Sequence, residues 1–206
     1  MLGIKKTIKL WLFKAKWRKL NKHNFTIANT NFPEKNVIIG KKTYGELNIY
    51  LGENLKRHLI IGHFCSIAPD VKFIINPHNY HFFSSWPFQR YEYDEFNYEW
   101  EKKLDIVVED DVWIGQGAII LGGAKLRKGC IVGAGSVVSG EVPEYAIFAG
   151  GKIIKFRFPP EICKKLSKID YNTFDEKLIR RIKGWHKIEI TEENVEDFLT
   201  LVPTLR

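Results

Sequence analysis

Aliphatic side chains recur every six residues between positions 108 and 143, and a small or β-branched residue follows each of them after four positions. A repeat this short is too small for a helix pair or a propeller blade, so it predicts a β-helix built from very short strands. In such a coil each repeat forms one face, and the aliphatic side chain fills the interior. The aliphatic positions are Val108, Ile114, Ile120, Leu126, Val132 and Val138, and the small or β-branched positions are Val112, Ala118, Ala124, Cys130, Ser136 and Val142.

The same period occurs less regularly before this run and is interrupted once. Residues 61–72 supply two further repeats, with Ile61 and Ile67 inward, whereas residues 73–107 contain no repeat and are dense in aromatic residues and histidine. An excursion of this length from a regular coil costs ordering entropy, which indicates a task such as forming a site or an interface. We therefore predict one β-helical domain over residues 25–158 with an excursion at 73–107.

The two ends of the chain do not follow the repeat. Residues 159–206 predict a cap of short helices at 161–168, 175–184 and 192–200, which would cover the open end of the coil. Residues 1–24 predict a basic, aromatic helix whose apolar residues do not form one clean stripe. Two interpretations of this helix stay open: an interfacial helix on anionic lipid, or a solvated helix whose apolar residues pack on the body.

The basic charge of the chain is confined to its first 24 residues. The net charge is +8, and this segment holds eight basic residues and no acidic one, so the remainder is neutral overall and does not indicate a nucleic-acid surface. The three cysteines are widely spaced, which argues against a disulfide framework and a zinc site, and we expect no metal. No apolar run reaches the length of a membrane span. These features predict a cytoplasmic protein, peripheral at the inner face of the membrane if residues 1–24 bind lipid.

Two stretches of the chain resemble the xenobiotic acetyltransferase branch of the hexapeptide-repeat acyltransferases: the coil DVWIGQGAIILGGAKLRKGCIVGAGSVVSGEVPEYAI and the preceding IGHFCSIAPDVKF with NPHNYHFFSSWPF. That branch includes streptogramin and chloramphenicol acetyltransferases and sugar O-acetyltransferases of capsule and lipopolysaccharide loci. The resemblance implies a mainly β fold, a left-handed parallel β-helix, which assembles as a homotrimer with sites between neighbouring subunits. It also implies acetyl-CoA as the co-substrate.

The resemblance implies a catalytic histidine on the excursion, nine residues before the proline of an aromatic-Pro-Phe element. Here that proline is Pro87 and the histidine is His78. A neutral imidazole is suited to take the proton of an acceptor hydroxyl while the thioester carbonyl is attacked, and then to protonate the departing thiolate. His81 is the rival base. Because Cys65 and Cys130 are expected to point into the coil, we predict direct transfer without an acetyl-cysteine intermediate.

The residues around the S-S-W-P-F element predict an acceptor pocket. Sugar rings and flat drugs both pack on aromatic faces, although these side chains could equally pack the excursion against the coil. The predicted acceptor-pocket residues are Tyr80, His81, Trp86, Pro87 and Phe88.

For the coenzyme, the resemblance implies that backbone groups around Gly115, Ala134 and Ser139 line the pantetheine arm. Trp113 follows an inward position and is expected to face outward, towards a subunit cleft. The chain departs from the family at Gly140, where a lysine is frequent, and in the short loop that runs from Gly151 straight into Lys152. The substitutes that we expect at the phosphates, with solvated edge charges as the alternative, are Lys152, Lys155 and Arg157.

These observations favour an acetyl-CoA-dependent O-acetyltransferase that acts on a hydroxyl of a surface polysaccharide or its lipid-linked precursor. Acetylation of a streptogramin or chloramphenicol in the same fold is the first alternative. The second is a trimeric scaffold that keeps the coil and binds no coenzyme, which the departures at Gly140 and Gly151 would permit.

Overall fold

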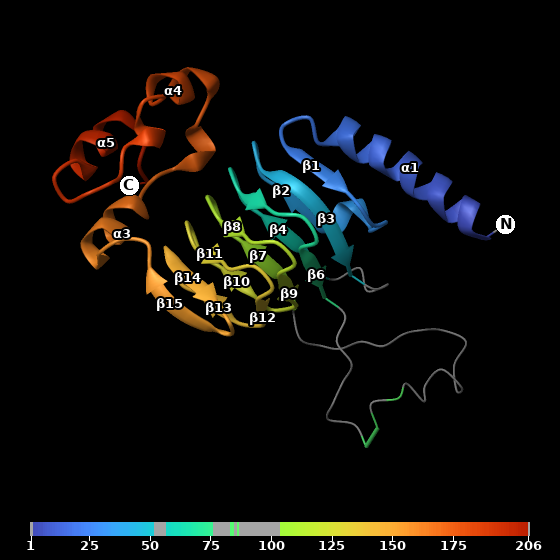
Figure 1. Ribbon diagram of the computed structural model, residues 1–206. Helices are drawn as coiled ribbons and strands as arrows, with labels where there is room; N and C mark the ends of the chain where they lie inside the picture. The colour runs from blue at the N-terminus through green and yellow to red at the C-terminus, as the bar shows by residue number, and fades with distance from the viewer. Residues whose placement is uncertain (1, 52–56, 76–82, 85, 87–103, 206) are drawn as a thin grey trace.

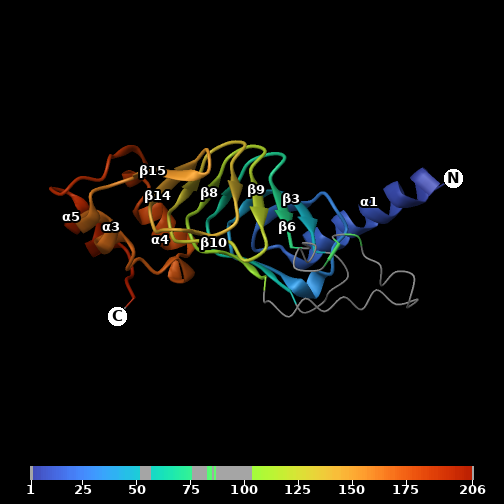
Figure 2. The same ribbon diagram turned by 90° about the horizontal axis from the view of Figure 1, so that it is seen from below.

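The computed structural model of the protein describes residues 2–51, 57–75, 83–84, 86 and 104–205. They form a left-handed parallel β-helix with a long helix beside its first coils and a helical cap at its far end (Figures 1 and 2). The predicted fold class is therefore confirmed.

Short parallel strands stack in three columns, and each column is one face of the coil. The first face holds β1 (Phe25–Ala28), β3 (Tyr44–Tyr50), β5 (Ser66–Ile67), β8 (Trp113–Ile114), β11 (Ile131–Val132), β14 (Ala146–Ala149) and β15 (Lys152–Phe156). The second face holds the end of β3, then β6 (Lys72–Ile74), β9 (Ile119–Leu121) and β12 (Val137–Val138). The third face holds β2 (Val37–Ile39), β4 (Leu59–Ile61), β7 (Ile106–Val108), β10 (Lys125–Leu126) and β13 (Glu141–Val142).

The interior of the coil is filled by the side chains that the six-residue pattern predicts. The aliphatic positions from Val108 to Val138 are all buried, and so are the small or β-branched positions that follow them. Regular structure also extends into both ends of the predicted excursion, because Phe73, Ile75 and Ile106 fill the interior too. The described coil continues to residue 75 and resumes at residue 104, so the limits 73 and 107 were too wide.

The C-terminal residues close the coil and form a second core. Strand β15 runs antiparallel to β14, and the helices that follow are shorter than the predicted ones. Lys128, almost fully buried, ties them to the coil by donating to the backbone carbonyls of Ser167 (2.6 Å) and Ile169 (3.0 Å). The helices are α3 (Pro160–Leu166), α4 (Glu176–Arg181) and α5 (Val195–Leu201), with 3-10 turns at Tyr171–Thr173 and Trp185–Lys187 and another, far from the cap, at Glu34–Asn36.

Helix α1 (Leu2–Leu20) lies where the sequence predicts a helix, and its C-terminal half packs on β1. Within the described part of the chain, no helix has both the length and the apolarity to span a bilayer.

Two turn glycines with the same backbone conformation provide a test of coil packing. Gly129 (φ +66°) and Gly135 (φ +67°) both lie in the left-handed region, where an alanine costs about 1–2 kcal/mol. A Cβ at Gly129 would lie 2.4 Å from the Tyr145 ring, whereas one at Gly135 would meet no heavy atom within 4 Å.

We therefore expect Gly129→Ala to lower the free energy of unfolding by roughly 1–3 kcal/mol more than Gly135→Ala, because only the first forces the buried Tyr145 ring to move. Urea unfolding at equal protein concentration measures the difference. An equal loss in both variants would contradict the packing of Tyr145 over this turn.

Candidate active site

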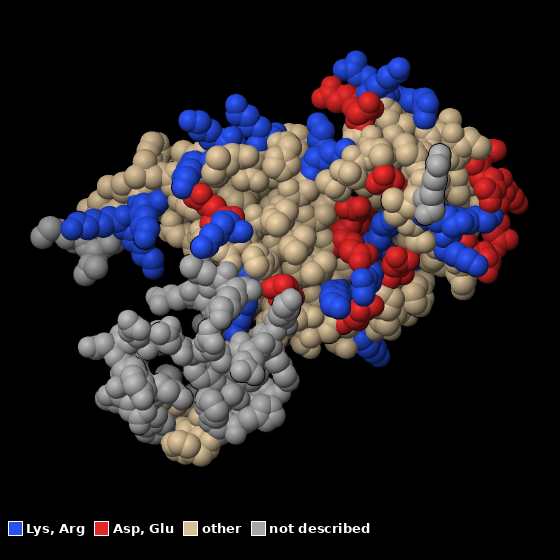
Figure 3. Space-filling view, turned by 180° about the vertical axis from the view of Figure 1, so that it is seen from behind, with Lys and Arg blue, Asp and Glu red and all other residues tan. Residues whose placement is uncertain are grey.

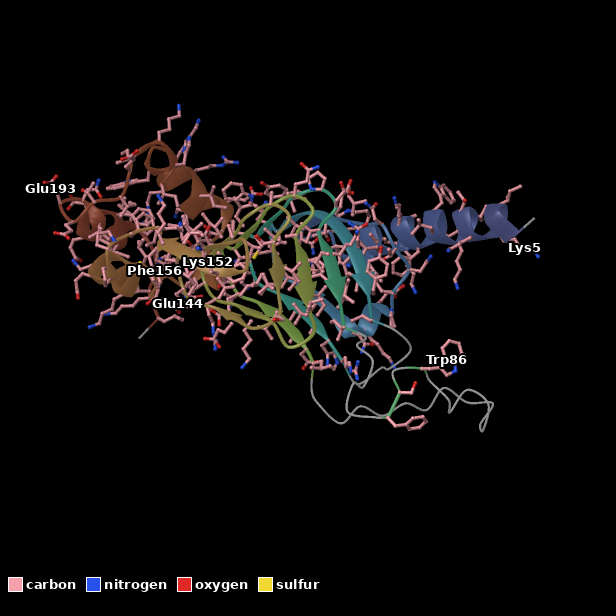
Figure 4. All side chains as sticks on the ribbon, turned by 60° about the horizontal axis from the view of Figure 1, so that its bottom comes forward. Lys5, Trp86, Glu144, Lys152, Phe156 and Glu193 are labelled. Atoms are coloured by element: carbon pink, nitrogen blue, oxygen red, sulfur yellow. The ribbon has the colours of Figure 1, made fainter. Side chains whose placement is uncertain are left out.

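Most of the predicted catalytic and acceptor-pocket residues lie outside the described residues. These are His78, Tyr80, His81, Pro87 and Phe88. Trp86 is described: its side chain is about half exposed, and its backbone N–H donates to Ser84 Oγ at 3.1 Å (Figure 4). The site is therefore built from the coil that carries the excursion.

The excursion leaves and rejoins the coil at the corner between its second and third faces, after β6 and before β7. In the next coil the N–H of Gly123 donates to the carbonyls of Leu104 and Asp105, each at 3.2 Å. Ser139, exposed, occupies the same corner one coil further on, between β12 and β13. We call this edge, formed by residues 104–105, 122–123 and 139–140, the excursion corner.

The corner between the first and second faces brings together two of the predicted coenzyme residues. The N–H of Gly115 donates to the Val132 carbonyl at 2.7 Å, and a Cβ at Gly115 would lie 2.6 Å from the nitrogen of Ala134. Ala134 is exposed, and neither Gly117 nor Gly135 has a heavy atom within 4 Å of an added Cβ. This edge, which we call the glycine corner, packs two coils closely at Gly115 and leaves open space over Gly117 and Gly135.

The second face connects the two corners. Lys72, Ile119 and Val137 are in register across β6, β9 and β12 and point outward. At about 3.3 Å per residue, a strand of two or three residues separates the corners by roughly 7–10 Å. Gly115, Ala134 and Ser139 therefore border one narrow surface, although Ser139 lies on its opposite edge from the other two.

The remaining predicted coenzyme residues lie on the first face. Trp113 points outward and is about half exposed, as expected from its position in the repeat. Its row continues through Ile131 and Ile147 to Lys155, which is about 14 Å away at the usual strand spacing. Lys152 and Lys155 are exposed on the edge strand β15, and Figure 4 shows Lys152 on that strand.

Arg157 differs from these two lysines because it is already engaged. Its guanidinium donates to Asp111 Oδ2 (3.1 Å) and to the Gly129 carbonyl (2.7 Å) and lies over the Phe158 ring. Burial raises the pKa of the Asp111 carboxyl, while Arg157 opposes that shift. The structure thus uses Arg157 to fasten the closing strand to the coil.

Both ends of the excursion are held by residues that the sequence analysis passed over. Arg57, which is 3% exposed, donates from Nη1 to the Ile75 carbonyl at 2.7 Å. The N–H of His58 donates to Asp105 Oδ1 at 2.7 Å, and the His58 ring lies 3.7 Å from the same oxygen. One signal for Arg57 was present in the sequence. It falls on an inward position of the alternation that Leu59 and Ile61 continue, where a charged residue needs a partner.

Among the described residues no group of three or more His, Cys, Asp or Glu side chains could hold a metal ion.

Comparison with known proteins adds to this geometry. Residues 105–140 match the bacterial transferase hexapeptide family, six repeats. The chain is 36% identical over 140 residues to a probable macrolide acetyltransferase of Lysinibacillus sphaericus, an alignment that covers 58% of this chain and 75% of that protein. It is 36% identical over 123 residues to a chloramphenicol acetyltransferase of Klebsiella aerogenes, which covers 55% of this chain and 58% of the relative.

A galactoside O-acetyltransferase of Lactococcus lactis is 27% identical over 145 residues, which cover 70% of this chain and 60% of that protein. The chain thus spans less than two thirds of the chloramphenicol and galactoside enzymes, but three quarters of the macrolide enzyme. On that identity and the hexapeptide match, the chain belongs to the hexapeptide-repeat acyltransferases, in their xenobiotic acetyltransferase branch, and is an acetyl-CoA-dependent acetyltransferase.

Proposed function

We propose that the protein transfers an acetyl group from acetyl-CoA to a hydroxyl of a sugar, in a surface polysaccharide or its lipid-linked precursor. The observation that carries this choice of acceptor is helix α1, which presents lysines and exposed apolar side chains at one end of the molecule. An enzyme that acts on a lipid-linked acceptor meets it more often when it is bound at the inner face of the membrane, where residues 1–24 would make peripheral contact. The galactoside O-acetyltransferase relative supports a sugar acceptor.

The coenzyme is proposed to lie along the glycine corner. The open backbone there at Gly117, Ala134 and Gly135 fits the narrow, amide-bearing pantetheine arm, whereas bulky side chains would exclude it, and Gly115 lets the two coils approach closely beneath it. Lys152 and Lys155, both on β15, would contact the phosphates of the coenzyme. Arg157 could contribute only in part, because it is already paired with Asp111. Ser139 and Trp113 complete the proposed lining.

A homotrimer would give this surface its second wall. The outward row of the first face carries Trp113, Ile131 and Ile147, an apolar strip that a neighbouring subunit could cover. Each site would then combine residues of two chains.

The proposed chemistry is direct transfer with His78 as general base. The imidazole takes the hydroxyl proton as the acceptor oxygen attacks the thioester carbonyl. The C–S bond then breaks, and the imidazolium returns the proton to the thiolate. Backbone N–H groups of a neighbouring coil would stabilise the tetrahedral oxyanion. Tyr80, His81, Trp86, Pro87 and Phe88 would wall the acceptor, and Arg57 and Asp105 hold the two ends of the excursion that carries them.

The buried cysteines support direct transfer over a covalent intermediate. Burial raises the pKa of both Cys65 and Cys130 to about 12, and both thiols lie inside the coil. A thiol with that pKa is almost entirely protonated near neutral pH and is a poor nucleophile.

A second candidate function is the acetylation of an antibiotic. The macrolide and chloramphenicol relatives favour it, since each is named for a drug acceptor. A scaffold without coenzyme is the remaining alternative, and the membership of the chain in an acetyltransferase family weighs against it.

We expect His78→Ala to lower acceptor-dependent release of CoA thiol by about 10²- to 10⁴-fold, because it removes the general base. The assay compares sugar and antibiotic acceptors, and His186→Ala, at an exposed position of the C-terminal cap, serves as the matched control with release close to that of the wild type. A variant at His78 that keeps its rate while His81→Ala loses it would move the base to His81. Release with an antibiotic and with no sugar would replace the first function by the second.

The thiols provide an independent prediction. In the folded protein at pH 8, a pKa of about 12 leaves about one thiolate in 10⁴, so iodoacetamide should leave Cys65 and Cys130 unmodified. Cys163, which is only partly buried, should react first. Peptide mapping by mass spectrometry gives the order. Rapid modification of Cys65 with loss of transfer would instead favour a covalent acetyl-cysteine.

A further inference from the structure

Helix α1 carries apolar side chains on two opposite sides. Phe13 and Trp17 face the coil, where both pack edge-on against Phe32 with ring centroids 4.9 and 5.1 Å apart. The other side carries an outer stripe with the spacing i, i+4, i+7 and i+8, which in a helix lies along one line. The outer stripe consists of Ile4, Ile8, Trp11 and Leu12.

The inner side holds the helix in a fixed orientation. Trp17 is fully buried, and its indole Nε1–H donates to Thr26 Oγ1 at 3.0 Å. Arg18 donates to the backbone carbonyls of Asn24 (2.8 Å) and Thr26 (3.0 Å). An open groove of about 900 Å³, lined partly by Lys6, separates the other half of the helix from the coil. The helix therefore stands out from the body, as Figures 1 and 2 show, and cannot turn its outer stripe inward.

Each residue of the outer stripe is more than half exposed, and no described residue covers it. Contiguous exposed apolar surface of this kind on one element marks a place of contact rather than ordinary solvent-facing surface.

The charges beside the outer stripe have one sign. At 100° per residue, basic side chains border it on both sides, and the first 24 residues contain no acid. Lys16 pairs with Glu34 at 2.8 Å, but Lys5 and Lys9 have no acidic partner among the described residues. In Figure 3 basic side chains gather at the end of the molecule that carries α1, and Figure 4 shows Lys5 near the tip of the helix. The bordering residues are Lys5, Lys9 and Lys16 on one side and Lys14 and Arg18 on the other, and Lys19 follows on the line of the stripe.

We propose that the outer stripe of α1 docks on an anionic lipid bilayer, with the helix in the plane of the interface. Ile4, Ile8 and Leu12 would enter the boundary of the acyl chains, Trp11 would lie among the headgroups, and the lysines would meet lipid phosphates. The coil covers only the side of α1 that carries Phe13 and Trp17, so the outer stripe needs a different partner. This inference deepens the proposed function, since it explains how a lipid-linked acceptor is met, but the docking itself rests on α1 alone.

The test is sedimentation of the full chain with vesicles of phosphatidylcholine alone or mixed with phosphatidylglycerol. Ile8→Glu is compared with Ile188→Glu, a matched change at a similarly exposed isoleucine (52% and 48%) in the C-terminal cap, at the opposite end of the molecule. The wild type and Ile188→Glu should bind the anionic vesicles alike, and binding should fall with added salt. Ile8→Glu should bind at least about tenfold more weakly, because it removes an isoleucine that the bilayer would bury and adds a negative charge.

Three outcomes would overturn the proposal. They are no binding of the wild type, equal binding of the two variants, or a change of oligomeric state in Ile8→Glu by light scattering, which would make a second copy the occupant of the stripe. Acetyl transfer to a water-soluble sugar, measured on the same preparations, separates the two hypotheses. If the wild type transfers nothing, the proposed function fails and the vesicle result stands. If transfer is normal and vesicle binding is absent, only the docking fails.

Discussion

Register between successive coils is the constraint on which the rest of the structure depends. Each coil buries one aliphatic and one small side chain per face, and its strands pair with the strands one turn before and one turn after. Shifting a strand by one residue would turn its buried side chain to the solvent. Residues eighteen positions apart, such as Trp113 and Ile131, therefore stay opposite each other, and the corners of the coil align into straight edges.

The candidate site follows from those edges. One edge brings Gly115 against Ala134, and the next carries both ends of the excursion and Ser139, so a surface only one short strand wide separates the proposed coenzyme path from those two ends. The ends of the coil have other tasks. Lys128 and Arg157 fasten the cap to the last turns, and Trp17 fastens a helix beside the first ones. The coil thus serves as the scaffold that positions the excursion, the cap and helix α1.

The coil could be predicted from sequence because one local rule repeats. The coenzyme edge and His78 were predicted from the resemblance of the chain to a known family, and they stay predictions. Other features depend on contacts between distant residues. Asp111 and Arg157 are 46 positions apart, and no spacing rule joins them. The limits of the excursion were misjudged because Phe73, Ile75 and Ile106 remain inward after the six-residue pattern stops. Because α1 has apolar side chains on two opposite sides, its sequence shows no single apolar face. The structure distinguishes the two sides, since one packs on the coil and the other is exposed.

If stacked coils build a coenzyme path along the glycine corner, calorimetric titration of the full chain with CoA will detect one saturable site. Ala134→Glu places a carboxylate on that path, and Ala15→Glu makes the same change at an exposed position of α1. We expect one CoA per chain for the wild type and Ala15→Glu, with binding at least about tenfold weaker in Ala134→Glu, because an unpaired carboxylate would be desolvated beside the ligand. Absence of CoA binding by the wild type, or equal affinity in the two variants, would contradict a coenzyme path there.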